Sequence, residues 1–344
     1  MKIAILSFYS GSVERGVENW VLELSARLVK KGHAVEVFYP PRGFYDASRI
    51  VNDLTLQRRF FVDYISRKIA QFSLKILPGL WLFKPDIVIP TNGGWQAAII
   101  RFFAWVRGGK MVIVGHSGEG WDDVNNLWSY PDVFVALTKQ AGKWARRVNP
   151  LVRVETIGDG VDLEKFSEDG DKARIRLKKP IVLAVGALEE SKRLDLTIKA
   201  VAKLRGASLL ILGNGSQKAS LNRLGGELLG NRFQLSSVKH DEIASYYRAC
   251  DVFTLPSWGG EAFGMVYLEA MAVGLSVVAT DDEKRREIVG EAGILVDPVD
   301  IGAYAVAIDR ALKRKWGDKP RKQAEKFAWE KIADKYEKLF VDLI

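Results

Sequence analysis

Short apolar runs alternate with amphipathic helical segments along nearly the whole chain, and this alternation constrains the fold most. The runs have the length and the Val, Ile and Leu content of buried strands, so the pattern predicts parallel sheets covered by helices. In the first half we expect strands at Lys2–Phe8, Ala34–Tyr39, Asp86–Pro90, Lys110–Val114, Asp132–Leu137 and Arg153–Ile157. In the second half we expect them at Ile181–Val185, Ser208–Leu212, Arg232–Leu235, Val252–Leu255, Ser276–Ala279 and Ile294–Val296.

The length of the chain predicts two domains. At 344 residues it exceeds the usual size of a single domain. The alternation pauses at 167–179, a charged stretch without apolar periodicity that we interpret as a linker. We therefore expect an N-terminal α/β domain at 1–166, a C-terminal α/β domain at 180–320 and a final helical segment at 321–344.

The composition of the chain indicates its cellular compartment and the kind of partner it binds. The single cysteine, Cys250, and three scattered histidines predict neither a disulfide framework nor a metal cluster, which favours a reducing, cytoplasmic location. The first apolar run predicts a strand rather than a signal peptide, and no run reaches the ~18 apolar residues of a membrane span. The net charge of +9 indicates an anionic partner such as a nucleotide or a membrane surface. Nucleic acid is the least favoured, because no recognised binding module appears.

The stretch Pro256–Thr280 carries the clearest chemical signal. It follows a strand-like run and contains a glycine-rich turn, a helical pattern closed by Gly274, and the next strand. A helix that begins after such a turn presents unpaired N–H groups and favours phosphate. Glu261 lies in the turn and Glu269 in the helix, where carboxylates can accept sugar or ribose hydroxyls. The combination suits a nucleotide-diphosphate sugar.

The same stretch resembles a known family. Glu261 and Glu269 with seven residues between them, the Phe263-Gly264 pair and the run Leu268–Ala272 resemble the signature of retaining glycosyltransferases of family 4. This resemblance implies a GT-B fold, in which two Rossmann-like domains face each other across a donor cleft and a C-terminal helix crosses back to the first domain. It also implies transfer of a hexose from a nucleotide-diphosphate sugar to an acceptor hydroxyl, with retention of anomeric configuration. We expect the donor to be a UDP- or GDP-sugar.

The family pattern also assigns site residues by position. Glu261 would orient the sugar, His116 would lie over it, and Lys192 would stabilise the departing diphosphate. The donor-binding positions are Gly16, Gly186, Lys192, Arg193, Gly213, Gly215, Phe263, Gly264, Met265 and Glu269. Arg15, Ala187 and the charged run Asp281–Arg286 depart from the pattern, standing where a glycine, an arginine and a Gly-Gly run are expected. Arg193 is the candidate to replace the missing arginine.

No metal or other cofactor is expected. Asp169-Gly170-Asp171 matches the Asp-x-Asp metal motif of the other major glycosyltransferase fold, but it lies in the charged linker rather than at the end of a strand. Two other functions stay open on the same fold: a nucleotide-sugar epimerase, and a non-catalytic or partner-dependent subunit. The acceptor is expected to be lipid-linked or a saccharide, in glycolipid, polysaccharide or glycoconjugate synthesis.

A basic stretch in the first domain leaves two interpretations open. Phe61, Ile65, Ile69, Phe72 and Ile76 recur at helical spacing until Pro78-Gly79, and the basic residues Arg58, Arg59, Arg67, Lys68 and Lys75 accompany them. A basic amphipathic helix suits the surface of an anionic membrane. Alternatively, the stripe packs on the sheet of its own domain and the basic residues face solvent. Nearby aromatics such as Trp81 and Trp105 favour a peripheral membrane association of this domain.

Overall fold

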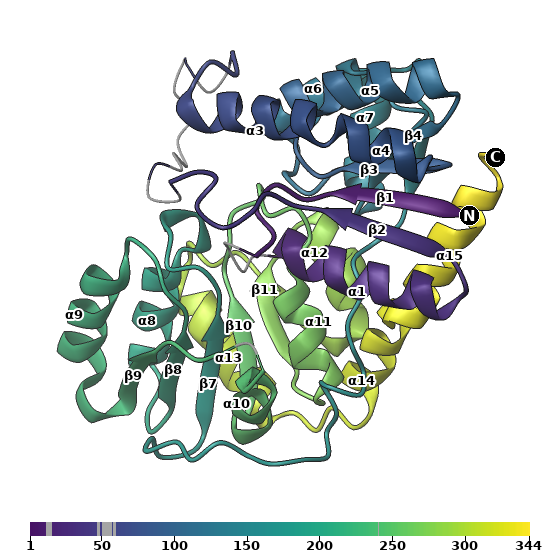
Figure 1. Ribbon diagram of the computed structural model, residues 1–344. Coiled ribbons are helices and arrows are strands. Elements are labelled where there is room, and N and C mark those ends of the chain that lie inside the picture. Colours follow the sequence, from purple (N-terminus) through teal and green to yellow (C-terminus); the bar gives the residue numbers. More distant parts are fainter. Residues whose placement is uncertain (12–15, 47–48, 50–56, 58–59, 240) are drawn as a thin grey trace. The chain divides into compact units, whose positions relative to one another are not determined.

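The chain forms two compact units in the computed structural model, which describes all residues except 12–15, 47–48, 50–56, 58–59 and 240 (Figure 1). The first unit comprises Met1–Asp159 and Trp329–Ile344, and the second comprises Gly160–Ala328. The N-terminal segment of the first unit ends at Asp159, where we expected 166, and the expected linker 167–179 lies within the second unit.

The first unit contains a six-stranded parallel sheet in the order β2-β1-β3-β4-β5-β6. Its strands lie close to the predicted bounds: β1 (Lys2–Leu6), β2 (Ala34–Phe38), β3 (Ile87–Pro90), β4 (Lys110–Val114), β5 (Val133–Ala136) and β6 (Val154–Thr156). Every residue of β3 and β5 is buried, as expected for strands with helices on both faces. The predicted strand–helix alternation is confirmed here.

The helices of the first unit include one from the end of the chain. Their bounds are α1 (Gly16–Lys30), α3 (Tyr64–Lys75), α4 (Leu77–Phe83), α5 (Trp95–Arg107), α6 (Trp121–Trp128), α7 (Lys139–Val148) and α15 (Trp329–Val341). α15 packs on α1, where Lys31 Nζ lies 2.8 Å from Glu337 Oε2 and Arg27 Nε lies 3.2 Å from Glu330 Oε1. The C-terminal helix therefore returns to the first unit, as the family resemblance implies.

The apolar stripe of α3 faces the core of its own unit. Ile65, Ile69 and Phe72 are buried and pack around Phe8. This arrangement confirms the packing alternative for the stripe; Arg58 and Arg59 lie outside the described residues. Pro78 stands in the first turn of α4, where a missing N–H costs no hydrogen bond, so a second helix follows α3 almost directly.

The second unit contains the other six-stranded parallel sheet, in the order β12-β11-β10-β7-β8-β9. Its strands are β7 (Ile181–Val185), β8 (Ser208–Leu212), β9 (Phe233–Ser236), β10 (Val252–Leu255), β11 (Val277–Thr280) and β12 (Gly293–Val296). This is the order of a Rossmann sheet. Successive strands are added on one side of β7 up to β9 and then on its other side from β10, so the strand order reverses between β7 and β10. Ligands of such sheets bind at the carboxyl ends of the strands beside that switch point.

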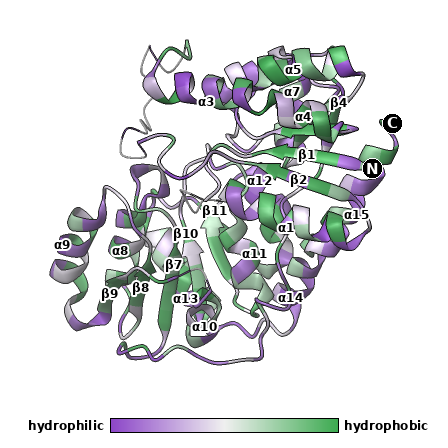
Figure 2. Ribbon diagram, in the orientation of Figure 1, coloured by the Kyte–Doolittle hydropathy of each residue, from purple (hydrophilic) through white to green (hydrophobic). Residues whose placement is uncertain are grey.

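The helices of the second unit cover this sheet. They are α8 (Leu194–Ala202), α9 (Lys218–Leu229), α10 (Ile243–Ala249), α11 (Met265–Ala272), α12 (Glu283–Val289), α13 (Ile301–Lys313) and α14 (Lys319–Ala324). Short 3₁₀ turns occur at η2 (Glu190–Lys192), η3 (Gly230–Arg232), η4 (Gly290–Ala292) and η5 (Glu325–Phe327). Figure 2 shows the strands as mainly hydrophobic, and the predicted core cysteine, Cys250, is buried between α10 and β10.

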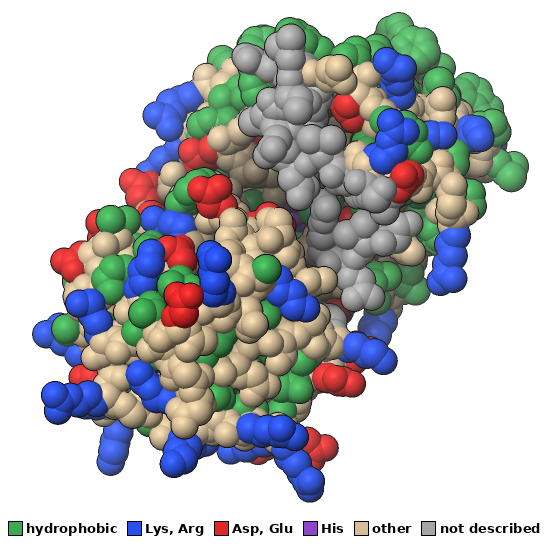
Figure 3. All heavy atoms as spheres, turned by 90° about the vertical axis from the view of Figure 1, so that its left-hand side faces the viewer, with side chains coloured by type: hydrophobic (Ala, Val, Ile, Leu, Met, Phe, Trp, Pro, Cys, Tyr) green, Lys and Arg blue, Asp and Glu red, His purple; other side chains and the backbone are tan. Residues whose placement is uncertain are grey.

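None of the helices in the described part of the chain has the length and apolar content needed to cross a membrane. On the face drawn in Figure 3, Lys and Arg side chains are spread over the surface, and hydrophobic side chains reach the surface along the upper edge.

Candidate active site

The switch point of the second sheet brings two predicted site residues together. The loop after β7 carries Lys192 and the loop after β10 carries Glu261, and these strands are neighbours. Lys192 Nζ forms an ion pair with Glu261 Oε2, and both side chains are partly buried. An ammonium and a carboxylate therefore stand side by side where α/β sheets bind ligands. If this ion pair opened, the ammonium could bind a phosphate and the carboxylate could accept a hydrogen bond from a hydroxyl.

The predicted glycines after β8 allow two loops to touch. A Cβ on Gly213 would lie 1.9 Å from the carbonyl oxygen of Gly186, and one on Gly215 would lie 2.6 Å from that of Leu188. Neither approach leaves space for a side chain. Both glycines thus lie beside the candidate site. The close contact between the two loops is sufficient to explain why these positions are glycine.

The start of α11 forms the third side of the site. Gly264 precedes the helix with φ +93°, a left-handed conformation that favours glycine, and a Cβ there would meet the Tyr267 ring at 2.6 Å. Phe263 is buried with its ring centroid 5.8 Å from that of Phe327, which anchors the turn. The Tyr267 N–H already donates to the Gly264 carbonyl at 3.0 Å, but the N–H groups of Met265 and Val266 precede the first hydrogen bond of the helix and favour an anion.

Glu269, predicted as the acceptor of ribose hydroxyls, is buried in α11. Tyr247 of α10 donates a hydrogen bond to its carboxylate at 2.8 Å. Burial raises the pKa of Glu269 to about 7, although the Tyr247 hydrogen bond and the charge of Lys165 act in the opposite direction. Tyr247 thus holds the carboxylate in one orientation, a contact that the linear sequence does not show.

Arg193 has a role that the sequence did not predict. Its backbone is left-handed with φ 48°, and its Nε donates to the carbonyl of Pro256 at 2.7 Å. The same guanidinium reaches the Ser257 carbonyl at 3.4 Å and the Thr280 hydroxyl at 3.3 Å. Arg193 therefore ties the loop after β7 to the loop after β10, whereas we expected it to face a diphosphate.

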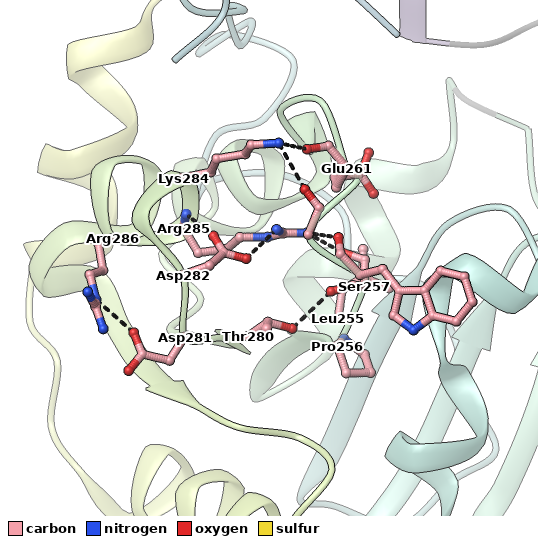
Figure 4. A network of polar contacts seen from close by, with 12 residues as sticks. Leu255, Pro256, Ser257, Glu261, Thr280, Asp281, Asp282, Lys284, Arg285 and Arg286 are labelled. Atoms are coloured by element: carbon pink, nitrogen blue, oxygen red, sulfur yellow. Dashed lines mark hydrogen bonds and ion pairs between the residues drawn. The ribbon is translucent and has the colours of Figure 1, made fainter. Parts of the chain in front are cut away.

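Two buried cations of α12 support the Glu261 loop from the other side (Figure 4). Lys284 Nζ donates to the Gly259 carbonyl at 2.8 Å and to the Glu261 carbonyl at 3.3 Å. Arg285 donates to the Ser257 hydroxyl at 2.6 Å and to the Trp258 carbonyl at 2.9 Å. Arg285 is fully buried and Lys284 is 2% exposed.

The charged run Asp281–Arg286 of the sequence leads into α12 and forms its first turn. The inward direction of its charges was missed. Between Ser257 and Glu261 the backbone is irregular, so its carbonyls lack sheet or helix partners and need other donors. Lys284 and Arg285 provide those donors, and Asp282 compensates the guanidinium at 2.5 Å.

In the first unit, His116 follows β4 as predicted and lies in an aromatic environment. Its ring centroid is 4.8 Å from that of Trp20 in α1, and burial lowers its pKa to about 3. The imidazole is therefore neutral at physiological pH. Gly16, the other predicted site residue of this unit, is the first residue of α1. Arg15 lies outside the described residues.

Buried polar groups from distant segments surround the same aromatic pair. The Trp20 ring also contacts Tyr336 of α15 at 5.8 Å, and Tyr336 interacts electrostatically with buried Asp159. Burial raises the pKa of Asp159 to about 7. Asp159, Trp20 and Tyr336 are not among the site residues that the sequence predicted. Because the three residues are far apart in the sequence, no local spacing pattern could have revealed this cluster.

Two family models match adjacent parts of the chain. The model described as Glycosyltransferase Family 4 matches residues 15–165, and the model described as Glycosyl transferases group 1 matches residues 165–330. Together they span both structural units. The chain is a family 4-like glycosyltransferase.

Relatives of this glycosyltransferase include two kinds of mycobacterial enzyme. The phosphatidyl-myo-inositol mannosyltransferase of Mycobacterium tuberculosis is 28% identical over 337 residues, covering 89% of this chain and 86% of that protein. The D-inositol 3-phosphate glycosyltransferase of Mycolicibacterium smegmatis is 35% identical over 199 residues, covering 53% of this chain and 46% of that protein.

Solved structures establish the GT-B fold of the glycosyltransferase. Sucrose-phosphate synthase from Thermosynechococcus elongatus aligns with a TM-score of 0.79 at 22% identity, covering 99% of this chain and 98% of that one. The pneumococcal O-GlcNAc transferase GtfA, solved with UDP and GlcNAc, aligns with a TM-score of 0.77 at 14% identity, covering 100% and 99%. The predicted fold class is confirmed.

Proposed function

We propose that this glycosyltransferase moves a hexose from a nucleotide-diphosphate sugar to a hydroxyl of a lipid-linked acceptor, with retention of anomeric configuration. The observation that carries the donor half is the Lys192–Glu261 pair at the switch point of the second sheet. The pair lies beside the start of α11. An ammonium, a carboxylate that can accept hydrogen bonds, and helical N–H groups thus converge where a sugar diphosphate would bind.

The chemistry follows from the charges that develop as the bond to the donor breaks. The sugar becomes positive and the leaving diphosphate becomes more negative. Lys192 and the N–H groups of Phe263, Gly264 and Met265 would stabilise the diphosphate, which is the main electrostatic requirement. Glu261 would orient the sugar through its hydroxyls, and Glu269 would accept from the ribose. In a front-face reaction the leaving phosphate takes the acceptor proton, so retention needs no protein nucleophile.

The neutral state of His116 fits a role toward the sugar. A neutral imidazole can donate or accept a hydrogen bond without adding positive charge beside a positive sugar. The lipid-linked acceptor rests on a relative named for its action on phosphatidyl-myo-inositol. UDP is our first choice of donor nucleotide, since two of the structural neighbours were solved with it.

Metal independence is part of the proposal. Among the described residues no group of three or more His, Cys, Asp and Glu could hold a metal ion. The positive charge that the diphosphate needs would come from Lys192 and the α11 terminus. We expect transfer to continue in EDTA; loss of transfer in chelator with rescue by manganese would contradict this part.

A donor screen followed by a transfer assay tests the proposal. Nucleotide sugars that bind the folded state raise its melting temperature, so UDP-, GDP- and ADP-sugars are compared first. The best donor is then incubated with phosphatidylinositol, and the anomeric configuration of the product is read by NMR. Glu261→Gln, which keeps a hydrogen-bonding side chain, is expected to retain donor binding and lose transfer. Conversion of the donor sugar without any acceptor would instead indicate an epimerase.

A further inference from the structure

The first unit exposes a cluster of large hydrophobic side chains on α3, α4 and α5. Seven such residues fall between 74 and 106: Leu74, Trp81, Leu82, Trp95, Phe102, Trp105 and Val106. The exposed fraction reaches 83% at Leu82 and 72% at Trp105. Single exposed hydrophobic residues are ordinary, but a contiguous group marks an interaction surface.

Part of this cluster is hollowed into a groove. A cavity of about 480 Å³ is lined by apolar residues alone: Leu74, Leu77, Trp81, Trp95, Ala98, Ile99, Phe102, Phe103 and Val106. Figure 2 shows the hydrophobic character of α4 and α5, which provide most of this lining. With no polar group in its walls, the groove suits a hydrocarbon chain rather than a sugar or a nucleotide.

The charges of the same helices are all positive. The sequences of α3, α4 and α5 contain five Lys or Arg residues and no Asp or Glu; Arg101 pairs with Asp132 at 2.7 Å, and Asp63 caps α3. One of these, Arg107, stacks over the Trp81 ring at 4.6 Å, at the rim of the groove. Among the described residues no carboxylate pairs with Arg107, and its Nε has no hydrogen-bond partner. Lys75 is exposed at the end of α3.

We propose that this face, the α3–α5 surface, docks on an anionic phospholipid bilayer. One acyl chain would enter the groove, and Arg107 and Lys75 would face the lipid phosphates. The proposal rests on the lipid-linked acceptor proposed above. It places the membrane contact at the exposed groove, because the apolar stripe of α3 is buried. Apolar insertion and basic residues together are the combination that holds peripheral proteins on membranes.

The composition favours a membrane over a protein partner. Tryptophan and arginine occur in both kinds of interface, but lysine is depleted at protein interfaces. A protein partner would need a carboxylate placed opposite each exposed cation. A bilayer with anionic headgroups matches it without specific geometry, and tryptophan is enriched at the membrane–water boundary.

Vesicle cosedimentation of the whole protein tests the docking surface. Vesicles of phosphatidylglycerol and phosphatidylcholine are compared with vesicles of phosphatidylcholine alone. We expect binding to the anionic vesicles that weakens as salt rises, because surface electrostatics are screened. The variant Leu74→Ser/Phe102→Ser/Val106→Ser removes exposed lining residues, and its affinity should fall by about tenfold or more.

Matched controls lie in the second unit. Leu228→Ser/Val299→Ser/Val306→Ser removes equally exposed hydrophobic residues there and should leave vesicle binding unchanged. Arg107→Gln should weaken binding to anionic vesicles only, whereas Arg223→Gln on α9 should not. Brominated acyl chains should quench tryptophan fluorescence, and Trp81→Phe/Trp95→Phe/Trp105→Phe, which replaces the three exposed tryptophans of the cluster, should lose that quenching.

Several outcomes would overturn the proposal. These are absence of wild-type binding at low salt, equal binding to neutral vesicles, and equal loss in the control variant. A dimer in sedimentation velocity that the groove variant dissolves, without vesicle binding, would identify a self-association face instead. Stabilisation by donor nucleotide is measured in parallel. If only vesicle binding fails, the docking surface is wrong and the proposed sugar transfer is unaffected. If only donor binding fails, the proposed function is wrong and the docking surface is unaffected.

Discussion

At the scale of single residues, the ion pair of Lys192 and Glu261 is the feature that donor binding would change most. We propose Lys192 as the cation that binds the diphosphate, since the Arg193 guanidinium donates to the carbonyls of Pro256 and Ser257. Lys192→Ala should therefore weaken binding of the nucleoside diphosphate by about 1.5–3 kcal/mol and leave binding of the nucleoside nearly unchanged. Isothermal calorimetry with both ligands measures the difference.

A matched control for Lys192 lies on α8. Lys199 pairs with Asp195 at the surface, so Lys199→Ala removes the same side chain away from the site. It should affect neither ligand. Equal losses for nucleoside and nucleoside diphosphate in Lys192→Ala would show that the residue supports the fold of the loop and not the phosphates.

Glu269 makes stability depend on pH in a direction opposite to that of most carboxylates. Burial raises its pKa from 4.5 to about 7, so the native state binds the proton more tightly than the unfolded chain. The contribution of Glu269 to stability is full below its unfolded pKa and is lost as pH rises through about 7. Glu269→Gln should remove this dependence, because a neutral amide still accepts from Tyr247.

Urea unfolding on both sides of this window checks the Glu269 prediction. The free energy of unfolding of Glu269→Gln relative to wild type should increase as the pH rises from about 5 to about 8. Glu227→Gln on α9 is the exposed control and should follow wild type throughout. If Glu269→Gln followed it as well, Glu269 would be ionised at all these pH values.

At the scale of elements, α12 decides how rigidly the Glu261 loop is held. The N–H and ammonium groups that bind its carbonyls come from a helix that follows the next strand, β11. Lys284→Met keeps the length and burial of the side chain and removes both hydrogen bonds. We expect the protein to fold and kcat/KM for the donor to fall about tenfold to a hundredfold, since charge-assisted hydrogen bonds are worth about 1.5–3 kcal/mol.

The neighbouring residue provides the control for Lys284. Arg286 is exposed and pairs with Asp281 at the surface, so Arg286→Met should leave donor kinetics unchanged. Steady-state kinetics with varied donor compares the two variants. An unchanged kcat/KM in folded Lys284→Met would mean that the loop keeps its shape without this support.

At the scale of the whole molecule, α15 belongs structurally to the first unit although it follows the second in sequence. Trp329, Tyr336 and Phe340 are buried there. A chain that ends at Ala328 should therefore lose stability in the first unit and keep it in the second. Hydrogen exchange followed by mass spectrometry should show faster exchange in β1 and α1 and unchanged exchange in β7 and β8. Equal loss of protection in both units would contradict this assignment.

Local patterns were sufficient to predict most of the architecture. Buried parallel strands such as β7 and β10 are continuous apolar runs, because both of their faces lie under helices, so they can be recognised one by one. Their alternation with helices implies parallel connections, and the glycine at the start of α11 is required by the backbone itself. The sequence therefore assigned Lys192 and Glu261 to loops that follow strands, but only the observed strand order shows that these two loops are neighbours.

Tertiary structure decided what each charged or aromatic side chain faces. Nothing in the run Asp281–Arg286 shows that Lys284 and Arg285 turn inward, because their partners are backbone carbonyls of another loop. The stripe of α3 and the groove beside α5 contain similar residues, yet one is buried and the other is exposed. Periodicity reports that a face is apolar; only the packing of the other elements determines whether that face is covered.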